Sequence, residues 1–166
     1  MSAIWWMLLG AAGIVFAALL VLSGGWIAPS EQPIFDVRLA GYDTAAAQAF
    51  VDALSAEQRR LYLGVFRTLD TAFPVLLAAT LLFGLWILAG AGWRFSQICA
   101  AFFAAAYLVA DLWENALVAE ILRSTATVDA DLVARASALT VSKWVTLGLG
   151  LYLTGAAWLR GPGWTR

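Results

Sequence analysis

The sequence contains no histidine, a single cysteine (Cys99), four prolines and only 13% charged residues. A lone cysteine cannot form a disulfide within the chain, and a thiolate zinc site needs more than one such ligand. Without histidine, the chain also lacks the residue that most often binds haem iron. The net charge of -1 gives no basis for nucleic-acid binding. We therefore expect no metal, no cofactor and no nucleic-acid partner.

The shortage of charge is matched by an excess of apolar residues, which make up 63% of the sequence. Soluble domains average about 45–50% apolar and about 25% charged residues. A chain this apolar cannot cover a water-facing surface, so the excess must face lipid. With 166 residues, the length fits one domain, and we expect residues 1–166 to form a single membrane domain.

Four segments are apolar over the length that a bilayer requires, which is about 20 residues. They cover about residues 4–22, 70–90, 96–120 and 138–160. The first lacks the basic residues that precede a cleaved signal peptide, so we expect it to be retained. The sequence thus predicts an all-α membrane protein with four transmembrane helices in a small bundle.

Four spans would place both termini on the same side as the short loop around Arg94. That side carries Arg94, Arg160 and Arg166 and no acidic residue. The opposite side has more basic residues, but most are mixed with acidic ones in the long connection between the first two spans. Because the positive-inside rule gives short loops the greater weight, we expect a bacterial inner (plasma) membrane protein with both termini in the cytoplasm.

The connection before the second span contains helix signals within residues 43–69. Asp43 or Thr44 can cap one helix, and Ser55 with Gln58 has the spacing of a capping box for a second. We expect an amphipathic helical cap at the membrane interface, the alternative being a solvated loop with partial helix. Pro74 should kink or break the helix that follows, and Thr127 should cap the last helix.

Polar residues inside the apolar segments form the most informative pattern, because a charged side chain in a span costs at least about 2.5–3.5 kcal/mol. Residues three and four apart share a helix face, and this spacing gathers the polar residues of three spans at one level, near the cap. The expected cluster comprises Arg67, Asp70, Tyr107, Asp111, Glu114, Asn115 and Lys143.

Two interpretations of this cluster remain open. In the first, Arg67 and Lys143 neutralise the acidic residues and fix the register of the helices. In the second, the cluster lines a pocket in which Asp111 and Glu114 exchange protons, which makes them the candidate catalytic residues. Three acids beside two bases are poorly suited to bind a metal.

Short segments spread over most of the chain resemble a family of small, uncharacterised bacterial membrane proteins with four helices. The segments are Phe35-Asp36 with Arg38 and Gly41-Tyr42, Leu69-Asp70 with Phe73-Pro74, Asp111 to Asn115, and Thr140 with Lys143-Trp144. The resemblance implies four membrane helices and carries no activity, substrate or partner.

The sequence leaves three functions open. The first is an accessory or structural subunit that binds membrane lipids or a partner, within a larger membrane protein complex. The second is a membrane-embedded enzyme or binding protein for a lipophilic ligand, using Asp111 and Glu114. The third is a proton or ion pathway, which the scarcity of polar residues in the other half of the spans disfavours. No catalytic motif is evident, so the sequence favours the first.

Overall fold

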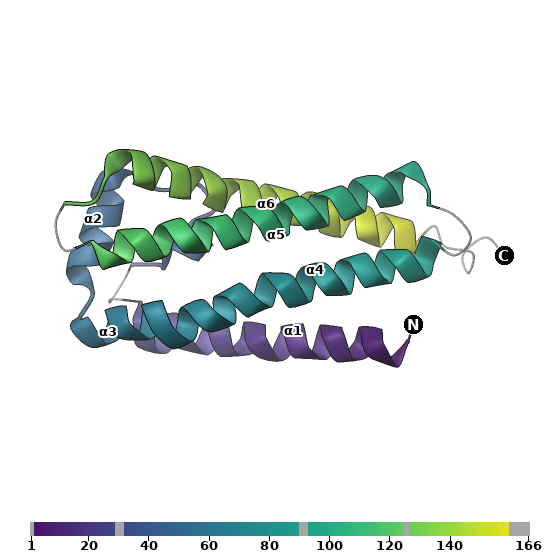
Figure 1. Cartoon of the computed structure of the whole chain (residues 1–166), viewed down its shortest axis with the longest axis horizontal. Helices are drawn as coiled ribbons and strands as arrows, with labels where there is room; N and C mark the ends of the chain where they lie inside the picture. Colours follow the sequence, from purple (N-terminus) through teal and green to yellow (C-terminus); the bar gives the residue numbers. More distant parts are fainter. Residues whose placement is uncertain (1, 29–31, 90–92, 125–126, 160–166) are drawn as a thin grey trace.

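A computed structural model describes residues 2–28, 32–89, 93–124 and 127–159, and its regular structure over these ranges is entirely helical. Four long helices lie side by side along one axis (Figure 1): α1 (Ala3–Leu22), α4 (Arg67–Ala89), α5 (Phe95–Arg123) and α6 (Ala130–Leu159). Three stretches are long and apolar enough to cross a membrane: Ala3–Ile27, Ala56–Ala89 and Phe95–Arg123. The expected all-helical fold is confirmed, and three of its helical stretches have the length and composition of membrane spans. The fourth expected span is not confirmed, because α6 is not among these three stretches.

The long helices pack in chain order, α1 against α4, α4 against α5 and α5 against α6, with the last pair in the most extensive contact. By contrast, α1 and α6 have very few contacts with each other. The outer faces are apolar, as shown by Met7 and Ile14 of α1, which are 71% and 74% exposed. Such side chains are expected to face lipid, and the α1–α6 side is the open seam of the packing.

Close packing of α1 on α4 depends on Gly84. The indole Nε1 of Trp5 donates a hydrogen bond to the Thr80 carbonyl oxygen at 3.1 Å. A Cβ at position 84 would lie 2.8 Å from that same Nε1. The missing side chain of Gly84 therefore makes the room that lets Trp5 reach the backbone of α4.

Replacing Gly84 with alanine should therefore lower stability by about 1–2 kcal/mol, although alanine is the better helix former. The added methyl group displaces Trp5 and costs its hydrogen bond. The matched control is Gly148→Ala on α6, where nothing lies within 4 Å of the new Cβ. Unfolding in mild detergent should show a loss at Gly84 and no loss at Gly148; equal results would rule out this packing role.

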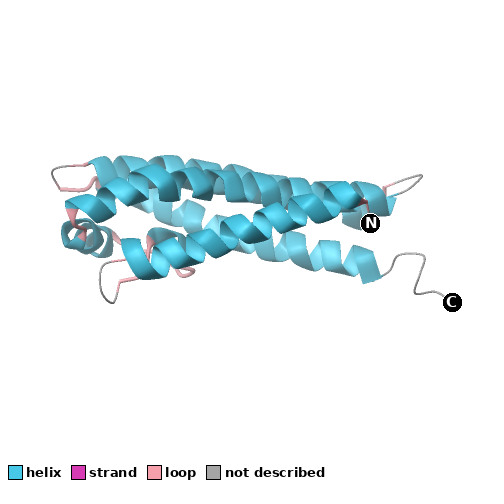
Figure 2. Ribbon diagram, turned by 90° about the horizontal axis from the view of Figure 1, so that it is seen from below, coloured by secondary structure: helices cyan, strands magenta, loops and turns pink. Residues whose placement is uncertain are grey.

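A cap covers the end of the long helices opposite the start of α1 (Figures 1 and 2). It consists of the 3₁₀ turn η2 (Phe35–Val37), α2 (Thr44–Ala53) and α3 (Ala56–Leu61). Asp43 caps α2 by accepting from the Ala46 amide at 2.8 Å. The Ser55–Gln58 capping box opens α3, which confirms the sequence prediction.

The cap is held by aromatic packing and by one arginine. The rings of Phe35 and Phe50 lie 4.8 Å apart, and both side chains are completely buried. Arg59 joins the cap to the end of α5, because its Nη1 donates to the Leu122 carbonyl at 2.7 Å and its Nη2 to the Val51 carbonyl at 3.1 Å. These last carbonyls of a helix have no partner within the helix itself. The cap is thus a packed part of the fold.

Two widened turns lie next to the cap. The π-helical turn η1 (Ser23–Ile27) extends α1, and the turn η3 (Tyr62–Phe66) joins α3 to α4, so residues 56–89 form one continuous helical stretch. Pro74 lies inside α4 and does not break it. The expectation of a break is therefore not met, and the proline instead leaves one carbonyl of the helix without its usual donor.

The start of α6 corrects another expectation. Thr127 lies before the helix and does not cap it; Asp129 does, by accepting from the Leu132 amide at 2.8 Å. Aspartate is at least as good an N-cap as threonine, so both residues satisfy the sequence rule. The sequence pattern therefore could not discriminate between them.

Candidate functional site

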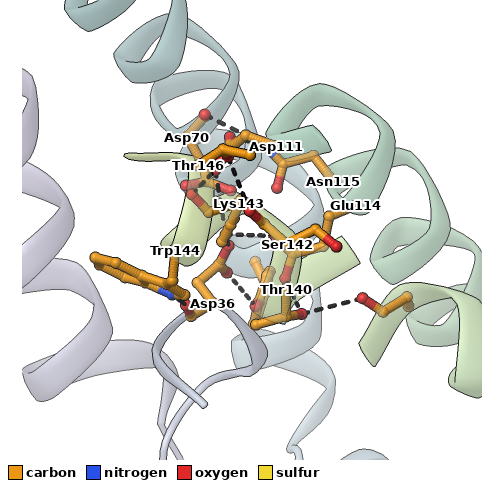
Figure 3. A network of polar contacts seen from close by, with 12 residues as sticks. Asp36, Asp70, Asp111, Glu114, Asn115, Thr140, Ser142, Lys143, Trp144 and Thr146 are labelled. Atoms are coloured by element: carbon orange, nitrogen blue, oxygen red, sulfur yellow. Dashed lines mark hydrogen bonds and ion pairs between the residues drawn. The ribbon is translucent and has the colours of Figure 1, made fainter. Parts of the chain in front are cut away.

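Lys143 is the centre of a buried ion cluster, which we define as Asp36, Asp111, Glu114 and Lys143. Its Nζ lies 2.7 Å from Asp36 Oδ1 and 3.2 Å from Asp111 Oδ1, and it also pairs with Glu114 Oε2. Figure 3 shows the lysine between Asp36 and Asp111. The Lys143 residue is only 3% exposed. Such a charge is tolerated because its ammonium group forms ion pairs with three carboxylates.

Asp36 ties the cap to the long helices. It lies in the 3₁₀ turn and is 7% exposed. Its Oδ2 accepts from the Tyr62 hydroxyl at 3.1 Å, and its backbone carbonyl accepts from the indole of Trp144 at 2.7 Å. This residue therefore joins the turn to both α6 and η3.

Glu114 is completely buried behind Lys143. Its second carboxylate oxygen, Oε1, accepts from the Thr140 hydroxyl at 2.5 Å. That hydroxyl also lies 3.1 Å from the Ala136 carbonyl, so two acceptors share its single hydrogen. Its two partners among the described residues, Lys143 and Thr140, both belong to α6, so Glu114 links α5 to α6.

Asn115 links α5 to the carbonyl that Pro74 leaves free. A proline at position 74 cannot donate to the carbonyl four residues earlier, which belongs to Asp70. Asn115 Nδ2 takes this place by donating to the Asp70 carbonyl at 3.2 Å, and it also lies 3.3 Å from Asp111 Oδ2. The proline and the asparagine thus act together to fix α4 against α5.

A cavity of about 140 Å³ lies beside the ion cluster. Its apolar walls include Phe16, Leu19 and Leu20 of α1, Phe73 of α4 and Leu147 of α6; Asp36, Asp70, Tyr107, Asp111 and Lys143 form its polar side. It is a partly open, mostly apolar pocket with its polar groups at one side. This combination is typical of small-molecule sites.

The structure brings six of the seven expected residues together. Asp111, Glu114, Asn115 and Lys143 form or join the ion cluster, while Asp70 and Tyr107 line the cavity. Arg67 does not take part, because its guanidinium forms no ion pair within the described part of the chain. The two candidate catalytic residues both pair with Lys143, but Asp111 lines the cavity and Glu114 does not.

Asp36 belongs to the ion cluster, although no spacing in the sequence predicts it there. The residue lies 107 positions from Lys143 and outside every apolar segment, so helical spacing cannot connect the two. Its one signal in the sequence is that it lies between the apolar residues Phe35 and Val37. It also belongs to one of the short segments that carry the family resemblance. Such a flanked aspartate indicates a turn packed on a core.

The loop after Asp36 is fixed from both sides. Gly41 has φ 79°, and a Cβ there would meet the Ser137 hydroxyl at 2.7 Å; this hydroxyl accepts from the Tyr42 amide at 2.8 Å.

The guanidinium of Arg38 lies 5.1 Å from the Phe35 ring centre. Burial lowers the pKa of Arg38. It raises the pKa of the Tyr42 hydroxyl, an effect to which the carboxylates of Glu114 and Asp36 add.

The described residues contain no group of three or more histidine, cysteine or acidic side chains arranged to hold a metal ion. No family model, curated protein or solved structure matches this chain. The family resemblance therefore rests on the short segments alone.

Proposed function

We propose that this protein crosses the membrane four times and binds a lipophilic small molecule in the cavity beside the ion cluster. The observation that carries the proposal is the cavity itself, with apolar walls from α1, α4 and α6 and charged groups on one side. Its volume is close to that of an apolar cavity known to hold benzene, about 150 Å³. A ring or a short section of an alkyl chain fits such a space.

The fourth span is supported by the surroundings of α6. The helix has 30 residues, which at about 1.5 Å per residue exceeds the thickness of the hydrocarbon core. It packs along α5, which is itself apolar enough to cross the membrane. Lys143 reduces the mean hydropathy of α6, but this charge is buried and neutralised by its partners. A four-span arrangement would put both termini on one side.

The route into the cavity is proposed to run through the seam between α1 and α6. These helices hardly touch, and each contributes residues to the cavity walls. On the α1 side the cavity wall is apolar and partly open: Leu20, which lines the cavity, is 55% exposed. A molecule dissolved in the bilayer could therefore reach the cavity without crossing water.

A proton or ion pathway has less support. The buried polar groups of α4 and α5 away from the ion cluster are satisfied locally. Thr80 donates to the Leu76 carbonyl, and Gln97 accepts from the Arg94 amide. These two side chains are bound to their own helices and do not extend the cluster as a relay.

The proposal is tested by a native mass spectrum of the protein extracted in mild detergent, compared with a variant whose cavity is filled. Leu147→Trp should release a bound molecule that the wild type retains, because the larger side chain occupies the cavity. The matched control is Leu149→Trp, which changes an outward-facing residue of the same helix that is 41% exposed. A mass addition that persists in Leu147→Trp would locate the ligand elsewhere. A stoichiometric partner chain, with no small molecule, would support the accessory role.

A further inference from the structure

Asp70 is the one carboxyl on the cavity wall that the ion cluster does not engage. The residue is 8% exposed and lines the cavity. Its backbone carbonyl is bound by Asn115, but its carboxyl group has no hydrogen bond or ion pair to any residue that the structure describes. Buried carboxylates are costly unless paired. A ligand in the cavity could therefore supply the partner that the Asp70 carboxyl lacks.

Among the residues that the structure describes, no cation is paired with Asp70. The ammonium group of Lys143 is already paired with Asp36, Asp111 and Glu114. Arg67 lies on the other side of Asp70, beside a separate, very small space that both residues line, and forms no ion pair in the described ranges. Three carboxylates thus share one ammonium group, and the Asp70 carboxyl lines the same cavity without a cation. This excess of acidic groups favours a ligand that brings a positive charge.

We propose that the cavity binds a lipophilic amine, with its ammonium group at Asp70 and its hydrocarbon part against Phe16, Phe73 and Leu147. The inference rests on the proposed function and adds the chemical class of the ligand. The cavity, of about 140 Å³, accommodates the head group and the first part of a chain. A longer chain would leave through the α1–α6 seam into the bilayer.

Hydrophobic walls alone would accept any compound of suitable shape, so the charge of the head group is the discriminating property. An alcohol of the same chain length offers Asp70 a hydrogen bond but no charge. A fatty acid would add a fifth carboxyl group beside the existing four. The Phe16 and Phe73 rings, stacked 5.3 Å apart, supply apolar surface for the hydrocarbon part of any of these molecules and do not distinguish their head groups.

The test compares dodecylamine, dodecanol and dodecanoic acid on the purified full-length chain in mild nonionic detergent. The three probes share one chain length, so differences report the head group. We expect dodecylamine to raise the melting temperature saturably, with an apparent Kd at least tenfold below those of the other two. Asp70→Asn should weaken dodecylamine binding at least tenfold. The control, Glu120→Gln, removes an exposed charge from α5 and should bind as the wild type does.

The outcomes separate the ligand class from the function. Equal binding of all three probes, lost in Leu147→Trp, would overturn the amine inference and leave the lipophilic pocket standing. Dodecylamine binding that Asp70→Asn does not weaken would also overturn it. The head-group comparison needs only the wild type, so a poorly folded Asp70→Asn variant would not remove the test. Binding by none of the probes would reject this ligand class, while the retained molecule in the native mass spectrum would still decide the proposed function.

Discussion

Replacing Lys143 with methionine should destabilise the protein by about 3–5 kcal/mol, the range expected when one partner of a buried ion pair is removed. Methionine preserves the length of the side chain, so packing changes little. Three buried carboxyl groups would lose their shared cation, and Glu114, which is completely buried, has no access to solvent. Unfolding by denaturant or heat in mild detergent measures the effect. It should exceed that of every other single substitution proposed above.

The control for this substitution is Arg135→Met. Arg135 lies on the same helix, is exposed and donates to the Asp131 carbonyl. The Arg135→Met substitution removes one positive charge and leaves the ion cluster intact, so we expect the free energy of unfolding to change by no more than about 0.5 kcal/mol. Adding Glu114→Gln to Lys143→Met should restore part of the lost stability, because it removes one of the unpaired carboxylates. Similar melting temperatures for the two single variants would mean that the ion cluster does not stabilise the fold.

The long helices could be predicted because lipid imposes a length and a composition on them. The cap could be predicted because Ser55 and Gln58 satisfy the backbone at the start of α3 through local contacts. In both cases the deciding interactions lie within a few residues of each other in the chain. The prediction of Thr127 as the N-cap residue of α6 is wrong. Thr127 and Asp129 are both suitable N-cap residues, they lie close together, and the sequence does not rank them.

The cluster on α5 was predictable for a similar reason. Tyr107, Asp111, Glu114 and Asn115 share a face through helical spacing, and all four are buried. Helical spacing does not reveal which of these side chains line the cavity. It therefore could not show that Asp111 faces the cavity while Glu114 lies behind Lys143. Nor could it show that Asp36, from the cap, joins the ion cluster while Arg67 forms no ion pair in the described part of the chain.

Pro74 illustrates a consequence that no local rule contains. The sequence predicts a kink because proline removes a donor. In the fold, Asn115 of α5 supplies the missing hydrogen bond to the Asp70 carbonyl. The proline thus creates a contact site between two helices, at the backbone of Asp70, whose side chain lines the cavity. A helix irregularity in the sequence marks the site, but only the packed structure identifies the partner.

Replacing Asp36 with alanine should cost about 3 kcal/mol and release the loop before α2. Lys143 would lose one of its three carboxylates, and the hydroxyl of Tyr62, a residue only 3% exposed, would lose its acceptor. The loss should be smaller than for Lys143→Met because Asp111 and Glu114 remain paired. Hydrogen exchange should become faster at the amides of Gly41 and Tyr42, which bond to the Arg38 carbonyl and to Ser137.

Asp36→Asn separates the charge from the hydrogen bond. Its amide oxygen can still accept from Tyr62, while the charge beside Lys143 is gone, so its stability should lie between those of the wild type and Asp36→Ala. The control is Glu57→Ala, which removes an exposed acidic side chain from the cap and should leave the exchange of the loop unchanged. Faster exchange over the whole chain in Asp36→Ala would indicate global destabilisation. Exchange confined to the loop would show that Asp36 anchors the cap, the part of the fold that brings this carboxylate to the cavity wall.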